Sequence, residues 1–317
     1  MRRCFMWLRL ICLLSVALFA SWASATTEPE ECRVVKFSDT GWTDVQVTTA
    51  SARYVLSALG YQVEVQRLSV PDTLQALADG NVDVFLGTWM PSMEKRIKPY
   101  LDNNQIQQIR VNLEGARYTL GVLQNVYDEG VKSFADLSKY AGKFDHEIYG
   151  LQPGGNGNKR IQNMISQNAY GLGDFKLIES SESVMLANVK RKELLNQWVV
   201  FLAWEPHPMN TQFKIAYLSG GEDVWGPNLG ASSVYTSTRK DYARKCPNVG
   251  RFLANLHFTI DMENKLSSEV LDQKTNPRRA VRNFLRENGA VLDKWLEGVQ
   301  SVSGTPGSAT VKAALAR

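Results

Sequence analysis

Three tryptophans each follow a stretch of sequence that predicts a β-strand. They are Trp42, Trp89 and Trp204, and Tyr118 adds a fourth large ring where a second set of strands begins. Open α/β sheets bind ligands outside the carboxyl ends of their strands. We therefore expect these rings to gather at one cleft, although each ring alone is also a candidate for core packing.

Aromatic rings around a cleft are suited to holding an organic cation. A quaternary ammonium has no N–H group, so its attraction to ring faces and the loss of water from its methyl groups must provide recognition. Each desolvated ring contributes about 0.5–2 kcal/mol, so four rings can provide micromolar affinity after the entropy cost of binding.

Two polar residues stand near these rings in the sequence. Asp44 lies two residues after Trp42 and is placed to accept a hydrogen bond from a ligand hydroxyl; it is equally well placed as an acidic residue in the first turn of a helix. Asn156 lies in the glycine-rich run PGGNGN at residues 153–158. That run predicts a tight turn before a helix from Asn158, and a helix start also offers free backbone N–H groups to a polar ligand atom.

Motifs of the common enzyme classes are missing from the sequence. It has no Gly-x-Ser-x-Gly, no His-Glu-x-x-His and no Gly-Lys-Ser/Thr phosphate loop. Its three histidines are scattered along the chain and are interpreted as structural. We therefore expect no catalytic residues, no metal site and no cofactor.

The elements that would carry these residues alternate between strand and helix. Residues 31–90 predict strand, helix, strand, helix, strand, and a second such series covers residues 118–203. This pattern indicates the α/β class with two lobes and a cleft between them. We assign residues 26–115 and 208–300 to lobe 1, residues 116–207 to lobe 2, and residues 301–317 to a disordered tail.

The first 25 residues have the order of a secretory signal: arginines, an apolar run, and the small triplet Ala-Ser-Ala before the predicted cut after Ala25. A membrane anchor is the alternative, but the apolar run is short for a bilayer. Cleavage leaves 33 basic and 32 acidic residues, a charge that gives no sign of nucleic-acid binding. It also leaves two cysteines, Cys32 and Cys246, expected to form a disulfide in an oxidising compartment, or else to remain buried thiols.

Three sequence blocks together point to a known family: SDTGWTD at residues 38–44, GTWMP at 87–91 and WEPH at 204–207. Over residues 31–299 the chain resembles the substrate-binding proteins of bacterial quaternary-amine ABC importers. The resemblance implies a two-lobed periplasmic binding protein fold of type II with the ligand in the interlobe cleft. It also implies an aromatic box made of Trp42, Trp89, Tyr118 and Trp204.

The resemblance further implies that Asp44 binds the ligand hydroxyl. One position departs from the family pattern, in which an asparagine follows Pro-Gly: this chain has Gly155 there, and Asn156 comes next. We therefore expect Asn156, or backbone N–H groups of the loop, to supply the second polar contact.

The resulting hypothesis is a monomeric periplasmic protein that captures choline or a related quaternary amine and delivers it to a membrane permease. Glycine betaine is the nearest alternative ligand, but its carboxylate would be repelled by Asp44 unless one group is protonated. A sensor that presents its ligand to a receptor is a further alternative. An exported enzyme acting on a choline ester or phosphocholine is the least favoured.

Overall fold

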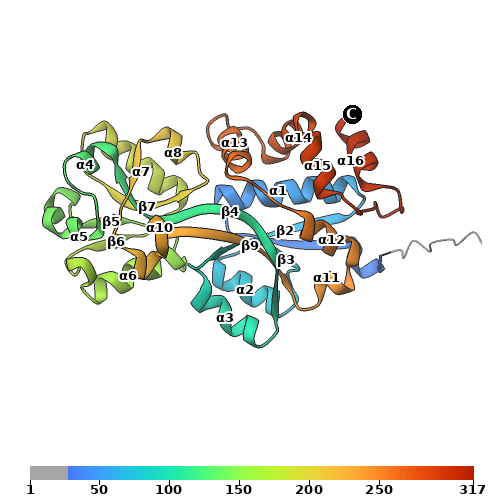
Figure 1. Cartoon of the computed structure of the whole chain (residues 1–317), viewed down its shortest axis with the longest axis horizontal. Coiled ribbons are helices and arrows are strands. Elements are labelled where there is room, and N and C mark those ends of the chain that lie inside the picture. The colour runs from blue at the N-terminus through green and yellow to red at the C-terminus, as the bar shows by residue number, and fades with distance from the viewer. Residues whose placement is uncertain (1–27) are drawn as a thin grey trace, which may run out of the picture.

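The computed structural model describes residues 28–317 (Figure 1). The predicted signal, residues 1–25, lies outside the described residues. Within residues 28–317, no helix combines the length and the apolar character needed to cross a membrane.

The core of the molecule is one mixed sheet with the strand order β2-β1-β3-β9-β4-β7-β5-β6, and β8 pairs with β4 at its side. The strands are β1 (Val34–Asp39), β2 (Gln62–Arg67), β3 (Val84–Met90), β4 (Ile106–Leu123), β5 (Glu147–Tyr149), β6 (Lys176–Ile178), β7 (Val200–Glu205), β8 (Ile215–Tyr217) and β9 (Ala231–Arg239).

Helices cover both ends of this sheet. The longer ones are α1 (Thr43–Ala58), α2 (Val70–Ala78), α3 (Glu94–Asp102), α6 (Asn156–Ser166), α7 (Glu182–Leu194), α12 (Pro247–Asn255), α13 (Ile260–Leu271), α14 (Pro277–Glu287) and α16 (Gly307–Leu315). The shorter ones are α4 (Gln124–Asp128), α5 (Phe134–Leu137), α8 (Met209–Gln212), α9 (Glu222–Trp225), α10 (Pro227–Gly230), α11 (Tyr242–Lys245) and α15 (Gly289–Trp295), with 3-10 turns at Glu30–Arg33, Ser138–Phe144 and Ala169–Gly171.

The predicted α/β class and the two lobes are confirmed. In the first lobe β1 pairs in parallel with β2 and β3, and α1 and α2 form the crossovers. In the second lobe β5 pairs in parallel with β6 and β7, connected through α6 and α7. Parallel strands need such helical crossovers, which is why the alternating pattern was visible in the sequence.

Two long antiparallel strands, β4 and β9, run from one lobe to the other (Figure 1). The sequence predicted only the part of β4 at residues 118–122. Its first part, from Ile106, alternates poorly between polar and apolar residues and was missed. These two strands connect the lobes, so each strand contributes residues to both lobes.

The predicted lobe border differs from the pairing in the structure. Strand β8 at Ile215–Tyr217 pairs with residues 121–123 of β4, and Ser133 bridges to Ser219. This segment therefore lies beside the strands of the second lobe, although residues 208–300 were assigned to the first lobe. A return to the first lobe along β9, from about residue 231, fits the pairing better.

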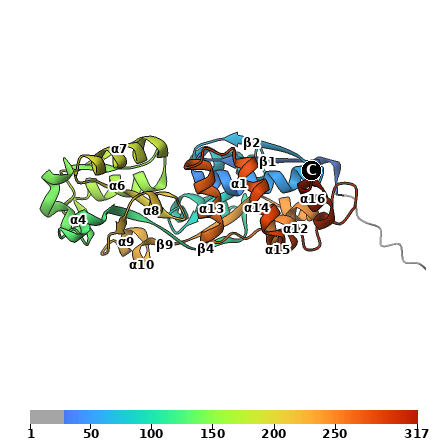
Figure 2. The same cartoon turned by 90° about the horizontal axis from the view of Figure 1, so that it is seen from above.

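The C-terminal helices pack on the first lobe, where α13, α14 and α16 lie against α1 (Figure 2). The predicted disulfide between Cys32 and Cys246 is present, with Cα atoms 5.5 Å apart. It ties the beginning of the described chain to the start of α12. Glu28 supports the same junction, because its Oε1 accepts hydrogen bonds of 3.0 Å from the N–H groups of Asn248 and Val249.

The prediction of a disordered tail at residues 301–317 is wrong. This segment forms helix α16, and Val311 and Leu315 are buried one turn apart. Lys312 pairs with Asp293 at 2.6 Å. Its small, polar composition suggested disorder, but two apolar side chains spaced by four residues are enough to attach a short helix to an existing core.

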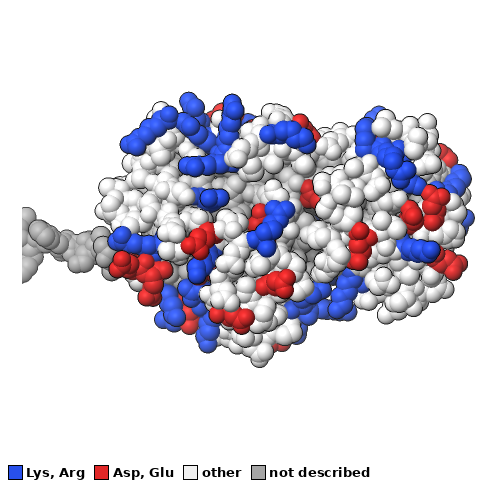
Figure 3. All heavy atoms as spheres, turned by 180° about the vertical axis from the view of Figure 1, so that it is seen from behind, with Lys and Arg blue, Asp and Glu red and all other residues white. Residues whose placement is uncertain are grey.

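Charged side chains are mixed over most of the face seen from behind (Figure 3). Basic side chains gather at its upper edge, where the C-terminal helices lie. Arg278, Arg279, Arg282 and Arg317 line a groove there between α1, α14 and α16.

Candidate ligand-binding site

The four predicted aromatic residues come from four different elements and meet at the junction of the lobes. Trp42 is the residue before α1, Trp89 lies in β3, Tyr118 in β4 and Trp204 in β7. Their side chains are nearly enclosed, with exposed fractions between 3% and 9%. The strand ends that the sequence analysis singled out therefore do converge on one place.

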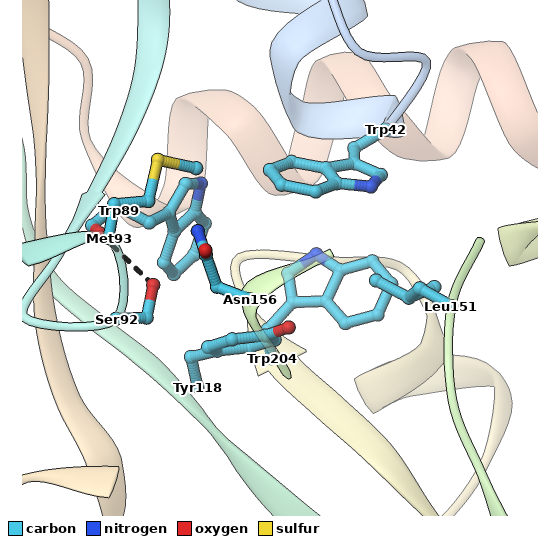
Figure 4. Close-up of a pocket in the computed structure, with 8 residues that line it drawn as sticks. All are labelled: Trp42, Trp89, Ser92, Met93, Tyr118, Leu151, Asn156 and Trp204. Atoms are coloured by element: carbon cyan, nitrogen blue, oxygen red, sulfur yellow. Dashed lines mark hydrogen bonds between the residues drawn. The ribbon is translucent and has the colours of Figure 1, made fainter. Parts of the chain in front are cut away.

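These rings surround a small pocket with almost entirely apolar walls (Figure 4). Ser92, Met93, Leu151 and Asn156 complete the lining. The structure thus brings five of the six predicted ligand-binding residues to the same cavity, and Asp44 stands outside the lining.

Neighbouring groups fix the orientation of the rings. Trp89 and Tyr118 have centroids 5.9 Å apart, and Trp225 packs edge-on against Tyr118 at 5.6 Å. The Gly157 N–H donates to the Tyr118 hydroxyl, whose pKa is raised, chiefly by burial. A Cβ at Gly157 would lie 2.0 Å from that hydroxyl oxygen, so only glycine fits at this point.

Asp44 lies behind Trp89, in the first turn of α1. Its Oδ2 accepts a 3.1 Å hydrogen bond from the Trp89 indole N–H, while its buried Oδ1 has no hydrogen-bond partner within residues 28–317. Burial and then the negative charge of Glu182 raise the pKa of Asp44 to about 7, although the hydrogen bond from Trp89 lowers it. Asp44 therefore fixes one ring of the pocket and keeps one oxygen available.

Asn156 opens α6, two residues earlier than the predicted start at Asn158. Its Oδ1 accepts a 2.8 Å hydrogen bond from the Arg96 guanidinium of the first lobe. That bond orients the amide so that Nδ2, which is buried and unpartnered in the described part of the chain, remains as a donor at the pocket. Gly155, where the family pattern has asparagine, is the N-cap of α6 and carries no polar side chain.

Two further buried acids near the start of α1 were not predicted. Glu182 begins α7 of the second lobe, and Glu263 lies in α13. Burial raises the pKa of Glu263 well above its usual range, and the charge of Asp44 adds to this effect. Glu182 is not among the residues predicted from the sequence, and nothing there signals that it reaches the other lobe.

Two α/β lobes joined by long strands, with an apolar pocket lined by aromatic rings between them, define a substrate-binding protein of the type that serves transporters. The chain belongs to the OpuAC family, described as the substrate-binding domain of ABC-type glycine betaine transport systems, which matches residues 33–287. The predicted family and the predicted periplasmic binding protein fold are therefore confirmed.

Solved structures of similar proteins support this assignment. An ABC-transporter choline-binding protein in complex with choline is 45% identical, with a TM-score of 0.89 over 91% of this chain and all of that one. An ABC-transporter choline-binding protein in an unliganded, semi-closed conformation is 44% identical over the same shares, with a TM-score of 0.84. Among curated sequences, protein ORF1 of Chromohalobacter salexigens is 43% identical over 46% of this chain and 94% of its own length.

Proposed function

We propose that this protein binds choline in the aromatic pocket and delivers it to the permease of an ABC importer. The observation that carries the proposal is the combination of four ring faces around one small pocket with a buried carboxylate behind them. None of the eight lining residues carries a positive charge. Such a site favours a cation that cannot donate hydrogen bonds.

The unpartnered atoms beside the rings support choline in particular. Asp44 Oδ1 is an acceptor and Asn156 Nδ2 is a donor. A hydroxyl can donate to the first and accept from the second at the same time. Choline has such a hydroxyl next to its trimethylammonium group, so one ligand group has the donor and the acceptor that these two atoms lack.

Glycine betaine is the second candidate because of the family's description and because Asn156 Nδ2 can donate to a carboxylate. Its carboxylate cannot donate to Asp44, and the two negative charges repel unless one is protonated. Glu182, whose pKa is lowered, adds negative charge near Asp44. Betaine is neutral overall, so it gains less from this environment than choline does.

The same proposal covers the remaining features of transport. The protein acts as a periplasmic monomer after cleavage near Ala25, captures its ligand as the lobes close, and performs no chemical reaction. The lining residues are suited to binding, since they are mostly apolar rings and include no nucleophile–base pair.

Isothermal titration of the purified mature protein with choline and, separately, glycine betaine at pH 8 tests the proposal. We expect micromolar or tighter binding of choline and at least tenfold weaker binding of betaine. The reverse order would replace choline by betaine on the same scaffold, and no heat from either ligand would refute a quaternary-amine site.

A further inference from the structure

The side chain of Glu182 crosses from the second lobe to the first at the edge of the aromatic pocket. Its Oε2 accepts a 3.1 Å hydrogen bond from the Thr43 backbone N–H, and its Oε1 accepts one from the Thr43 hydroxyl. Thr43 is separated from Glu182 by 139 residues and belongs to the first lobe. The carboxylate is 8% exposed, so these contacts are sealed from water.

This contact completes a helix end that the first lobe leaves unfinished. The N-cap residue of α1 is Trp42, whose side chain makes no capping hydrogen bond. The first N–H groups of a helix need an acceptor from elsewhere, and the helix end favours a negative charge. Glu182 supplies both from the opposite lobe, so α1 has this cap only when the lobes are together.

The second partner of Glu182 lies beneath another ring of the pocket. The Met209 N–H donates to His207 Nδ1 at 3.0 Å, which leaves Nε2 as the ring nitrogen that carries a hydrogen. His207 Nε2 then donates to Glu182 Oε1 at 3.2 Å. The imidazole also packs against Trp204, with centroids 4.7 Å apart and planes at 62°.

Glu182 therefore connects Thr43, which follows Trp42, with the His207 ring, which packs against Trp204. Figure 4 shows these two indoles on opposite sides of the pocket, one from each lobe. Burial raises the pKa of Glu182, but hydrogen bonds from His207 and Thr43 outweigh it and the pKa is lowered overall, so the group is a carboxylate at neutral pH.

We infer that Glu182 is a positioning residue that holds the closed form of the protein and sets the separation of Trp42 and Trp204. It is not among the residues that line the pocket. Its contribution is present only in the closed form, so it slows ligand release and has little effect on encounter. The choice of ligand in the test rests on the proposed function; the interlobe contact itself does not.

Stopped-flow tryptophan fluorescence with choline tests this inference. We expect Glu182→Gln to release choline at least tenfold faster, equivalent to about 1.4 kcal/mol, with the association rate within about threefold of wild type. The amide keeps the size of the side chain but cannot accept from Thr43 and His207 with both of its terminal atoms. Glu193→Gln, on the same helix but paired with Lys190 near the surface, should release choline at the wild-type rate.

A second variant keeps the inference testable if Glu182→Gln does not fold. Thr43→Val removes the hydroxyl but keeps the backbone N–H and the side-chain shape, and should speed release less than Glu182→Gln. The release rate of the double variant should exceed that of Glu182→Gln by a small factor at most, because both changes break the same contact. Fully multiplicative effects, or a wild-type release rate in Glu182→Gln, would overturn the inference.

Hydrogen exchange with a second ligand separates this inference from the proposed function. If wild type binds glycine betaine instead of choline, the proposed ligand is wrong, but the lobes still close and the contact can be measured at the Thr43 amide. We expect faster exchange of that amide in ligand-saturated Glu182→Gln than in ligand-saturated wild type and Glu193→Gln. Equal exchange in all three saturated proteins would show that Glu182 does not cap α1.

Discussion

The two lobes touch on two sides of the pocket, and the contacts differ in kind. On the α1 side, the buried Glu182 carboxylate joins Thr43 and His207. On the opposite rim, Arg96 donates to Asn156, and Arg160 Nη2 donates to the Pro91 carbonyl at 3.0 Å. The first side is acidic and closed to water, whereas the second is basic and partly open.

This difference indicates a division of roles. A hydrogen bond to a buried charge contributes more to stability than one near solvent, because water competes with the latter. The acidic side is therefore expected to determine how firmly the ligand is held. The rim is expected to orient Asn156 and to make a smaller contribution.

The largest expected effect comes from removing a ring on the acidic side. Trp204→Ala removes one ring face that the cation contacts, and it also removes the indole against which His207 packs. Choline affinity should therefore fall at least tenfold. Calorimetry measures the loss. Trp198→Ala is the control, because this buried tryptophan packs against Phe144 away from the pocket and should lower stability without changing the affinity of the folded protein. Unchanged affinity in Trp204→Ala would exclude that ring from the site.

A charge change at Asp44 should have the next largest effect. Asn at this position can still accept from the Trp89 indole, so Asp44→Asn removes the charge and weakens the interaction with a ligand hydroxyl. We expect about a tenfold loss for choline and a smaller loss for tetramethylammonium, which lacks the hydroxyl. Titration of both ligands gives the comparison, and equal losses would leave Asp44 with a purely electrostatic role.

The same residue should make binding pH-dependent. The pKa of Asp44 is raised to about 7 in the unliganded protein, so the carboxyl is largely protonated at pH 6. A bound cation favours the ionised form, so binding releases protons and choline affinity should rise between pH 6 and pH 8, by at most tenfold per unit. Asp44→Asn should flatten this profile, and a flat wild-type profile would contradict the role of Asp44.

Stability should respond to pH in the opposite direction. The folded protein holds the Asp44 proton more tightly than the unfolded chain, whose carboxyl has its usual pKa of 3.8. Between these two pKa values the folded state binds more protons, so the Asp44 contribution to the free energy of unfolding decreases as pH rises from about 4 to 7. Denaturant titrations of wild type and Asp44→Asn measure this difference.

The smallest expected effect is on the rim. Arg96→Met removes the donor that orients Asn156 and should weaken choline binding by about two- to fivefold while leaving tetramethylammonium unaffected. Lys98→Met, which breaks an exposed pair with Asp102 on the same helix, serves as the control. A loss in Arg96→Met as large as that in Glu182→Gln would remove the distinction between the two sides.

The sequence was sufficient to predict the parts of the site that depend on local order. Open α/β sheets bind ligands outside the carboxyl ends of their strands, so Trp89 and Trp204, which lie near the ends of β3 and β7, were predicted to face one cleft. Asn156 was likewise near the start of a predicted helix. The ring positions therefore followed from the spacing of strands and aromatic residues.

The remaining features depend on how distant segments meet. The contact of Glu182 with Thr43 exists only because two lobes approach each other, and no local pattern marks it. Asp44 had a predicted ligand contact, but its bond to Trp89 required the packing of α1 against β3. Helix α16 was missed because its apolar contacts come chiefly from Val311 and Leu315 within a segment of small and polar residues.

The central claim is that aromatic rings and buried acids recognise a positive charge. It is tested most directly by comparing choline with 3,3-dimethylbutan-1-ol, which has the same shape and hydroxyl but a carbon in place of the ammonium nitrogen. With four rings at about 0.5 kcal/mol or more each, we expect the neutral compound to bind at least about 30-fold more weakly in calorimetry at pH 8. Equal affinities would contradict the claim and leave apolar burial as the source of binding.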